Sequence, residues 1–312
     1  MTAVKTEFTF KSVSGLADIH AVSYVPENKE SVKAVLQIAH GMAEHLERYE
    51  NFADVLCANG IAVYINDHIG HGASVSSKEE LGYFGEKDGW KNFVEDCHKL
   101  LEIAKKEFPA KPYIFFGHSM GSFVARSFSA KYYKELDGAV FCGTSGPNPG
   151  AAIAIHLANL IAKTKDTHYR SKLIDKMAFG TYNSKFEKRT AFDWLSRDNE
   201  QVDKYIADEL CGFLFTAYGY RDLFCVLTDV SQKSWFENYP KELPVLIISG
   251  ENDPVGEYGK GVTKVYDSLK NAGKSNVEMH LYKDGRHEIL NEEALFSTVC
   301  KDVVSWIEKI IQ

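Results

Sequence analysis

The 312-residue sequence lacks the features that mark disulfide-rich, membrane-spanning and nucleic-acid-binding proteins. Its six cysteines lie far apart and include no CxxC pair, so we expect reduced, mostly buried thiols instead of a disulfide framework. No apolar stretch reaches the roughly 18 residues that a membrane span requires. The net charge of −7 argues against nucleic acid as the main partner.

The first ten residues also lack the continuous apolar run of a secretory signal. They alternate polar and apolar side chains, which is typical of a strand, and we therefore expect a cytoplasmic protein. Hydrophobic residues make up 45% of the chain and charged residues 25%, as in ordinary globular proteins. The chain is long enough to fold around a core without a metal or a disulfide.

Short apolar or alternating segments recur along most of the chain and are separated by helix-like segments. We expect strands at residues 6–10, 19–25, 32–39, 61–66, 113–116, 138–143, 244–249 and 277–282. The clearest helix pattern runs from Trp90 to Phe108, with apolar residues at i, i+3, i+4 and i+7. Strands that alternate with helices predict an α/β fold with a mostly parallel sheet.

The alternation stops after residue 143 and resumes near residue 244. Between these points the sequence shows helix patterns and no convincing strand. We therefore expect one α/β core, formed by residues 1–146 and 233–312, that carries a helical cap insertion at residues 147–232.

The segment Gly117-His118-Ser119-Met120-Gly121 matches G-x-S-x-G, a pattern that is weak by itself. Here it follows an expected strand and precedes an expected helix, and a sharp strand-to-helix turn exposes the central hydroxyl. Ser119 is therefore the candidate nucleophile, and the alternative is a glycine-rich turn without chemistry.

A serine hydroxyl needs a base and an acid that orients the base, and on this fold they follow in the order serine, acid, histidine. Of the histidines after Ser119, only His287 lies in a loop between an expected strand and the last helix. The loop after residues 244–249 supplies Asp253 as the acid. Glu251 and Asp284 are less well placed alternatives.

The oxyanion of an acyl-transfer intermediate needs two backbone N–H donors. The sequence predicts Met120, directly after the nucleophile, and Met42, in the loop that follows residues 32–39. Spacing in this loop does not fit a helix-borne metal motif, so we expect neither a metal nor a cofactor. The residues expected to support the site are His40, Gly41, Gly117, His118 and Gly121.

These motifs resemble those of the monoglyceride lipase and lysophospholipase family of α/β hydrolases, of the serine aminopeptidase S33 type. The shared segments are H-G-x-x-E-H at residues 40–45, D-x-x-G-H-G-x-S at 67–74, G-H-S-M-G at 117–121 and G-x-x-D at 250–253. The segment from Asp193 to Asp198 is similar to that of bacterial members. The resemblance covers essentially the whole chain and implies an α/β-hydrolase fold with a cap.

The expected activity is hydrolysis of monoacylglycerols, lysophospholipids or similar acyl esters through an acyl-enzyme. An aminopeptidase-like amidase, an acyltransferase and, more remotely, a catalytically silent binding protein remain as alternatives. Ile153, Leu157 and Leu160 form an apolar stripe of the cap, which suggests either core packing or the lining of an acyl pocket. Transient contact of the cap with a membrane surface is a further hypothesis, and the sequence leaves the oligomeric state open.

Overall fold

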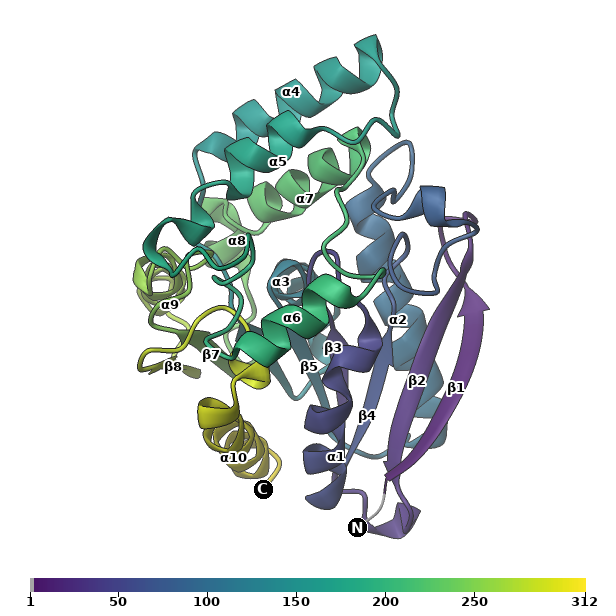
Figure 1. The fold of residues 1–312 in the computed structure, drawn as a ribbon. Helices are drawn as coiled ribbons and strands as arrows, with labels where there is room; N and C mark the ends of the chain where they lie inside the picture. The colour runs from purple at the N-terminus through teal and green to yellow at the C-terminus, as the bar shows by residue number, and fades with distance from the viewer. Residues whose placement is uncertain (1–2) are drawn as a thin grey trace.

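The computed structural model describes residues 3–312, which contain a single eight-stranded sheet (Figure 1). The strand order is β1-β2-β4-β3-β5-β6-β7-β8, and every pair from β4 onward is parallel. β1 and β2 form an antiparallel hairpin at one edge. The strands are β1 Ala3–Lys11, β2 Asp18–Pro26, β3 Ala34–Ala39, β4 Ile61–Asn66, β5 Tyr113–His118, β6 Gly138–Cys142, β7 Val245–Gly250 and β8 Val277–Tyr282.

The five central strands β3 to β7 are buried at every position. Their near-continuous apolar runs fit this burial, because helices cover both faces of a parallel sheet. One face packs against α1 (Glu50–Ala58) and α10 (Glu293–Ile310). The opposite face packs against α2 (Gly89–Glu107), α3 (Met120–Tyr132) and α9 (Lys260–Asn271).

The segment between β6 and β7 is helical within the described residues, apart from an isolated bridge between Arg170 and Thr216. In Figure 1, α4 and α5 lie at the top of the molecule, away from the sheet. α4 packs on α7 and α5, and α7 in turn contacts α2 and α3 of the core. The helices of this segment are α4 Gly150–Thr164, α5 Lys172–Phe179, α6 Asn199–Ala207, α7 Ala217–Asp229 and α8 Lys233–Asn238.

The eight strands overlap the segments expected from the sequence, and their ends differ by a few residues. The arrangement is that of an α/β hydrolase, with a mostly parallel sheet between two layers of helices. All six cysteines are free thiols, and five of them are buried. Among residues 3–312, no helix is both long and apolar enough to cross a membrane.

Candidate active site

Ser119 occupies the single residue between β5 and α3, in a backbone conformation that strains a non-glycine residue. Its φ of 54° and ψ of −121° reverse the chain direction at the carboxyl end of the strand. A Cβ on Gly117 would lie 2.0 Å from the carbonyl oxygen of Gly121, and a Cβ on Gly121 would lie 2.0 Å from that of Ala39. The two glycines of the motif are therefore required by close backbone packing around the turn.

His287 and Asp253 come from two different loops and meet in the buried interior. His287 lies between β8 and α10, and its Nδ1 is 2.9 Å from Oδ2 of Asp253, which follows β7. The second oxygen of Asp253, Oδ1, accepts the Val255 N–H at 2.8 Å. Because the Asp253 carboxylate can only accept a hydrogen bond, Nδ1 of the neutral His287 ring carries the proton. Nε2 is then left as the basic nitrogen.

The charges around His287 favour its protonated form. Burial alone lowers the pKa of His287, but the charge and hydrogen bond of Asp253, with the carboxylates of Glu288 and Glu44, outweigh it and raise the pKa. The ring of His118 lies 4.7 Å from that of His287. Burial and the charge of His287 lower the pKa of His118 to about 4, so His118 is neutral beside the base.

The expected oxyanion donors lie on both sides of Ser119. Met120 is the first residue of α3, so its N–H has no acceptor within the helix and lies at the positive end of the helix dipole. Met42 follows Gly41, and a Cβ on Gly41 would lie 3.2 Å from Cβ of Ser119. Both methionines line the same cavity as Ser119.

His40 sets the orientation of the peptide that carries the Met42 N–H. Its Nε2 accepts the His68 N–H at 2.9 Å, so the proton is on Nδ1, which donates to the Gly41 carbonyl oxygen at 2.8 Å. Burial lowers the pKa of His40 and keeps this ring neutral. Because a trans peptide is planar with C=O and N–H opposed, the Met42 N–H is directed away from His40.

The histidines and acids of this loop point to separate partners, which does not favour a shared metal ion. Glu44 binds Arg48 and Tyr49, whereas His45 pairs with Asp208 at 2.7 Å. Cys211 lies near that pair, and the three ligand atoms are within 4.8 Å of one another. Burial raises the pKa of the Cys211 thiol, which disfavours the thiolate that a metal would need. The expectation that no metal takes part stays a prediction.

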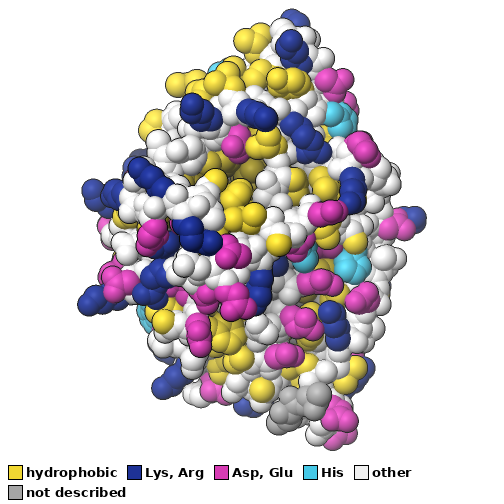
Figure 2. Space-filling model, viewed as in Figure 1, with side chains coloured by type: hydrophobic (Ala, Val, Ile, Leu, Met, Phe, Trp, Pro, Cys, Tyr) yellow, Lys and Arg dark blue, Asp and Glu magenta, His cyan; other side chains and the backbone are white. Residues whose placement is uncertain are grey.

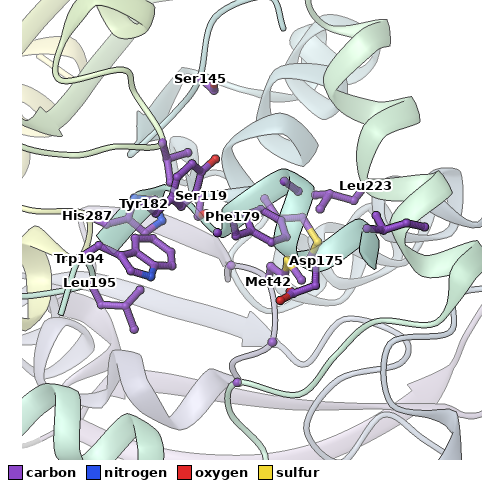
Figure 3. A pocket seen from close by; sticks show the side chains of 18 of the residues that line it. Met42, Ser119, Ser145, Asp175, Phe179, Tyr182, Trp194, Leu195, Leu223 and His287 are labelled. Atoms are coloured by element: carbon purple, nitrogen blue, oxygen red, sulfur yellow. The ribbon is translucent and has the colours of Figure 1, made fainter. Parts of the chain in front are cut away.

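Ser119 and His287 open into a cavity of about 570 Å³, a typical size for a small-molecule site. Figure 3 shows Ser119, His287, Tyr182 and Trp194 grouped at one end, with Phe179 and Leu223 farther along. Most of the lining is apolar and comes from the segment between β6 and β7. Its few polar side chains away from the nucleophile include Ser145, Asn148, Asp175 and Asn183.

The three expected pocket residues of α4 differ in position. Leu157 and Ile153 line the cavity, and Ile153 is 65% exposed, which places it at the opening. Leu160 is 58% exposed and is not among the lining residues. The prediction for Leu160 is therefore wrong, because α4 turns its buried alanines, Ala151, Ala158 and Ala162, inward.

Trp194 is a site residue that the sequence motifs did not identify. Its indole ring lies 5.2 Å from the ring of His287, and its carbonyl oxygen accepts the His287 N–H. The next residue, Leu195, accepts the Glu288 N–H at 2.7 Å. The only available signal was the similarity of residues 193–198 to bacterial family members.

Comparisons with known proteins identify the family of this chain. A model of the family described as serine aminopeptidase, S33, matches residues 30–294. The chain is 29% identical to the monoacylglycerol lipase of Mycolicibacterium smegmatis, over 98% of each chain, and 25% identical to human monoglyceride lipase, over 89% of this chain and 83% of the relative. A carboxyl esterase of Bacillus coagulans, solved with glycerol, superposes over all of both chains with a TM-score of 0.92 and 29% identity. The chain belongs to the serine aminopeptidase S33 family of α/β hydrolases and is a hydrolase similar to monoglyceride lipases and lysophospholipases.

Proposed function

We propose that this chain is a serine carboxylic-ester hydrolase that acts on monoacylglycerols, lysophospholipids or related acyl esters. The observation that supports the substrate class best is the largely apolar cavity that contains both Ser119 and His287. An acyl chain gains about 0.8 kcal/mol for each methylene that it buries, so such a cavity favours long acyl groups over short ones.

In the proposed mechanism, Ser119 Oγ attacks the ester carbonyl while Nε2 of His287 takes the hydroxyl proton. Asp253 keeps the proton of the ring on Nδ1 and stabilises the imidazolium through the 2.9 Å contact. The N–H groups of Met42 and Met120 bind the oxyanion, and each such donor typically lowers the barrier by about 3–4 kcal/mol. His287 then protonates the leaving alcohol and activates the water that releases the acyl group. Neither a metal nor a cofactor is needed.

We further propose that residues 147–232 act as a cap that selects the acyl group. Leu157, Phe179 and Leu223 belong to this segment and line the cavity, whereas the nucleophile and base belong to the sheet and its loops. Differences in chain-length preference would then arise in the cap, while the chemical step stays with the core.

A panel of monoacylglycerols, lysophospholipids and aryl esters of increasing acyl length tests the substrate class. We expect kcat/KM to rise with acyl length and to vanish in Ser119→Ala, together with labelling by a fluorophosphonate probe. A preference for acetyl esters would refute the lipid substrate but leave the hydrolase. Labelling that persists in Ser119→Ala would refute the nucleophile.

The alternatives are an aminopeptidase-like amidase and an acyltransferase that uses the same serine. An aminopeptidase would need a free acidic group to hold the ammonium of its substrate, but the cavity carboxylates of Glu44 and Glu288 bind Arg48. Asp175 already accepts the Tyr220 hydroxyl at 2.9 Å. Hydrolysis of amino-acid anilides faster than of the best ester would favour the amidase, and transfer to added alcohol in preference to water would favour the acyltransferase.

The outer surface of the cap favours contact with a lipid surface. Ile153, Leu160, Leu173 and Met177 are each more than half exposed. Figure 2 shows hydrophobic and basic side chains gathered at the top of the molecule, over α4 and α5. Apolar side chains framed by cations are typical of surfaces that lie on anionic membranes. Co-sedimentation with anionic liposomes should fall in a Leu173→Ser/Met177→Ser variant, and no binding by the wild type would refute the contact.

A further inference from the structure

Arg48 is held between two buried carboxylates that flank the candidate active site. Its Nη1 donates to Glu44 Oε2 and to Glu288 Oε1, each at 2.7 Å, and its Nη2 donates to Glu288 Oε2 at 2.7 Å. Only 12% of the Arg48 side chain is exposed, and the two carboxylates are almost fully buried. The two contacts to Glu288 form a bidentate pair, the geometry that an arginine, but not a lysine, provides.

The two ends of this bridge lead to the two loops that must cooperate in catalysis. Glu44 Oε1 accepts the Gly41 N–H at 2.5 Å and the Tyr49 hydroxyl at 2.8 Å, so it holds the loop that carries Met42. Glu288 directly follows His287 in the chain. A single guanidinium therefore connects the oxyanion loop to the loop of the base, across 240 residues of sequence.

The cap covers the same bridge. The Tyr205 ring of α6 lies 4.9 Å from the guanidinium carbon of Arg48, and its hydroxyl donates to the Ala43 carbonyl oxygen at 3.1 Å. The Gly212 N–H donates to the same oxygen at 2.9 Å. The bridge is thus kept away from water on the side where solvent would otherwise weaken its charges.

Two carboxylates and one guanidinium leave a net charge of −1 beside the base. The other groups that face His287 are Asp253, which is paired with it, the neutral His118, and Tyr182 of the cap, which burial keeps protonated. Among residues 3–312, Glu44 and Glu288 are therefore the groups that add negative charge next to that of Asp253. Negative charge at this position stabilises the imidazolium that forms when Ser119 is deprotonated.

We propose that Arg48 is a positioning residue that fixes the oxyanion loop relative to His287, and that the charge of Glu288 stabilises the imidazolium of His287. The inference rests on the proposed ester hydrolysis, because it assigns roles within that reaction. A purely structural salt bridge would affect stability alone, so the tests measure a pH profile and the separation of kcat from KM.

Glu288→Gln removes one charge while it keeps the shape of the side chain. We expect the acid limb of kcat/KM, measured on a soluble aryl ester, to move down by roughly 0.5–1 pH unit. The plateau rate should fall, because a weaker base accepts the serine proton less readily. Asp137→Asn is the matched control, since it removes a carboxylate that accepts the Tyr113 N–H just before β6, at the end of the sheet opposite the site, and should leave the profile unchanged.

Arg48→Lys keeps the charge but cannot contact both carboxylates in the same way. We expect kcat to fall about 10- to 100-fold, as misplaced catalytic groups do, with KM changed less than about threefold. Because Arg48→Lys can fail to fold, the neutral triple variant Glu44→Gln/Arg48→Met/Glu288→Gln provides a second test. A buried ion triad can be replaced without loss of folding, so this variant should fold and still show the low kcat.

A Glu288→Gln profile that superposes on the wild type would overturn the electrostatic part of the inference. A folded Arg48→Lys or triple variant with wild-type kcat would overturn the positioning part. Either result leaves the proposed function intact, provided that wild-type hydrolysis depends on Ser119. A wild type that hydrolyses no ester would instead refute the proposed function itself.

Discussion

Asp253→Asn changes one atom next to the base, and the contacts of Asp253 determine its effect. Oδ1 accepts the Val255 N–H at 2.8 Å, and Oδ2 lies 2.9 Å from Nδ1 of His287. If the asparagine keeps its oxygen toward Val255, its NH₂ group faces Nδ1. Because that group can only donate, Nδ1 must accept, and the ring proton moves to Nε2, where it blocks attack by Ser119.

The opposite orientation of the amide would keep the correct tautomer but would leave the Val255 N–H facing an NH₂ group. An unsatisfied buried donor costs about 1–3 kcal/mol. Ser249 does not oppose the first orientation, because its hydroxyl, 3.2 Å from Oδ2, can rotate to accept. We therefore expect the inactive tautomer to dominate and kcat to fall by about 10³- to 10⁴-fold, as in other Ser-His-Asp triads, or about 4–5 kcal/mol of barrier.

The assay is the steady-state hydrolysis of a soluble aryl ester, with circular dichroism to confirm folding. Asp284→Asn and Glu251→Gln are matched controls, since both residues were alternative acids in the sequence and neither is hydrogen-bonded to His287. Asp284 has a φ of 61°, a conformation that asparagine tolerates. An Asp253→Asn variant that keeps more than about a tenth of the wild-type kcat, or an Asp284→Asn variant that loses as much as Asp253→Asn, would refute this role of Asp253.

Three other changes have defined outcomes. Gly121→Ala places a Cβ 2.0 Å from the Ala39 carbonyl oxygen. Urea unfolding should therefore show that the free energy of unfolding falls by at least about 3 kcal/mol, or the variant should give no soluble protein. A stability close to that of the wild type would contradict this close packing. Leu157 lies on the cavity wall, so Leu157→Trp should lower kcat/KM at least about tenfold for hexadecanoyl esters and little for butanoyl esters. Leu160 is exposed, so Leu160→Trp should change kcat/KM for neither ester. Equal effects of Leu157→Trp on the two esters would show that α4 does not select the acyl chain. Burial raises the pKa of Asp96 from 3.8 to about 6, so the stability that protonated Asp96 contributes is full below pH 3.8 and is lost as the pH rises through 6. The difference in unfolding free energy between the wild type and Asp96→Asn should therefore change by about 2–3 kcal/mol between pH 4 and 7. A difference that stays constant over this range would refute the pKa shift.

The sequence was sufficient to predict the fold and to single out Ser119, Asp253 and His287, because the signals for each are local. A run of strand residues ends at a glycine-flanked serine, and Asp253 and His287 follow strands in the expected order. Whether these residues act as a triad stays a prediction that the experiments above test.

The features that the sequence did not predict depend on pairs far apart in the chain. Arg48 and Glu288 are 240 residues apart, and no spacing rule connects them. The prediction that Leu160 lines the pocket was wrong for a different reason, because apolar residues occupy several sides of α4. The small alanines of this helix are buried, α4 packs on α7, and Leu160 is left exposed.

The most direct test of the account is to trap the acyl-enzyme. A slowly deacylated aryl ester is quenched with acid during turnover, and the protein is digested with trypsin and analysed by mass spectrometry. The peptide of residues 107–126 contains two serines, Ser119 and Ser122. We predict that the acyl mass appears on Ser119, and is absent from the peptide in Ser119→Ala. Acylation of Ser122 or of another peptide, or turnover without any acylated serine, would contradict the central claim.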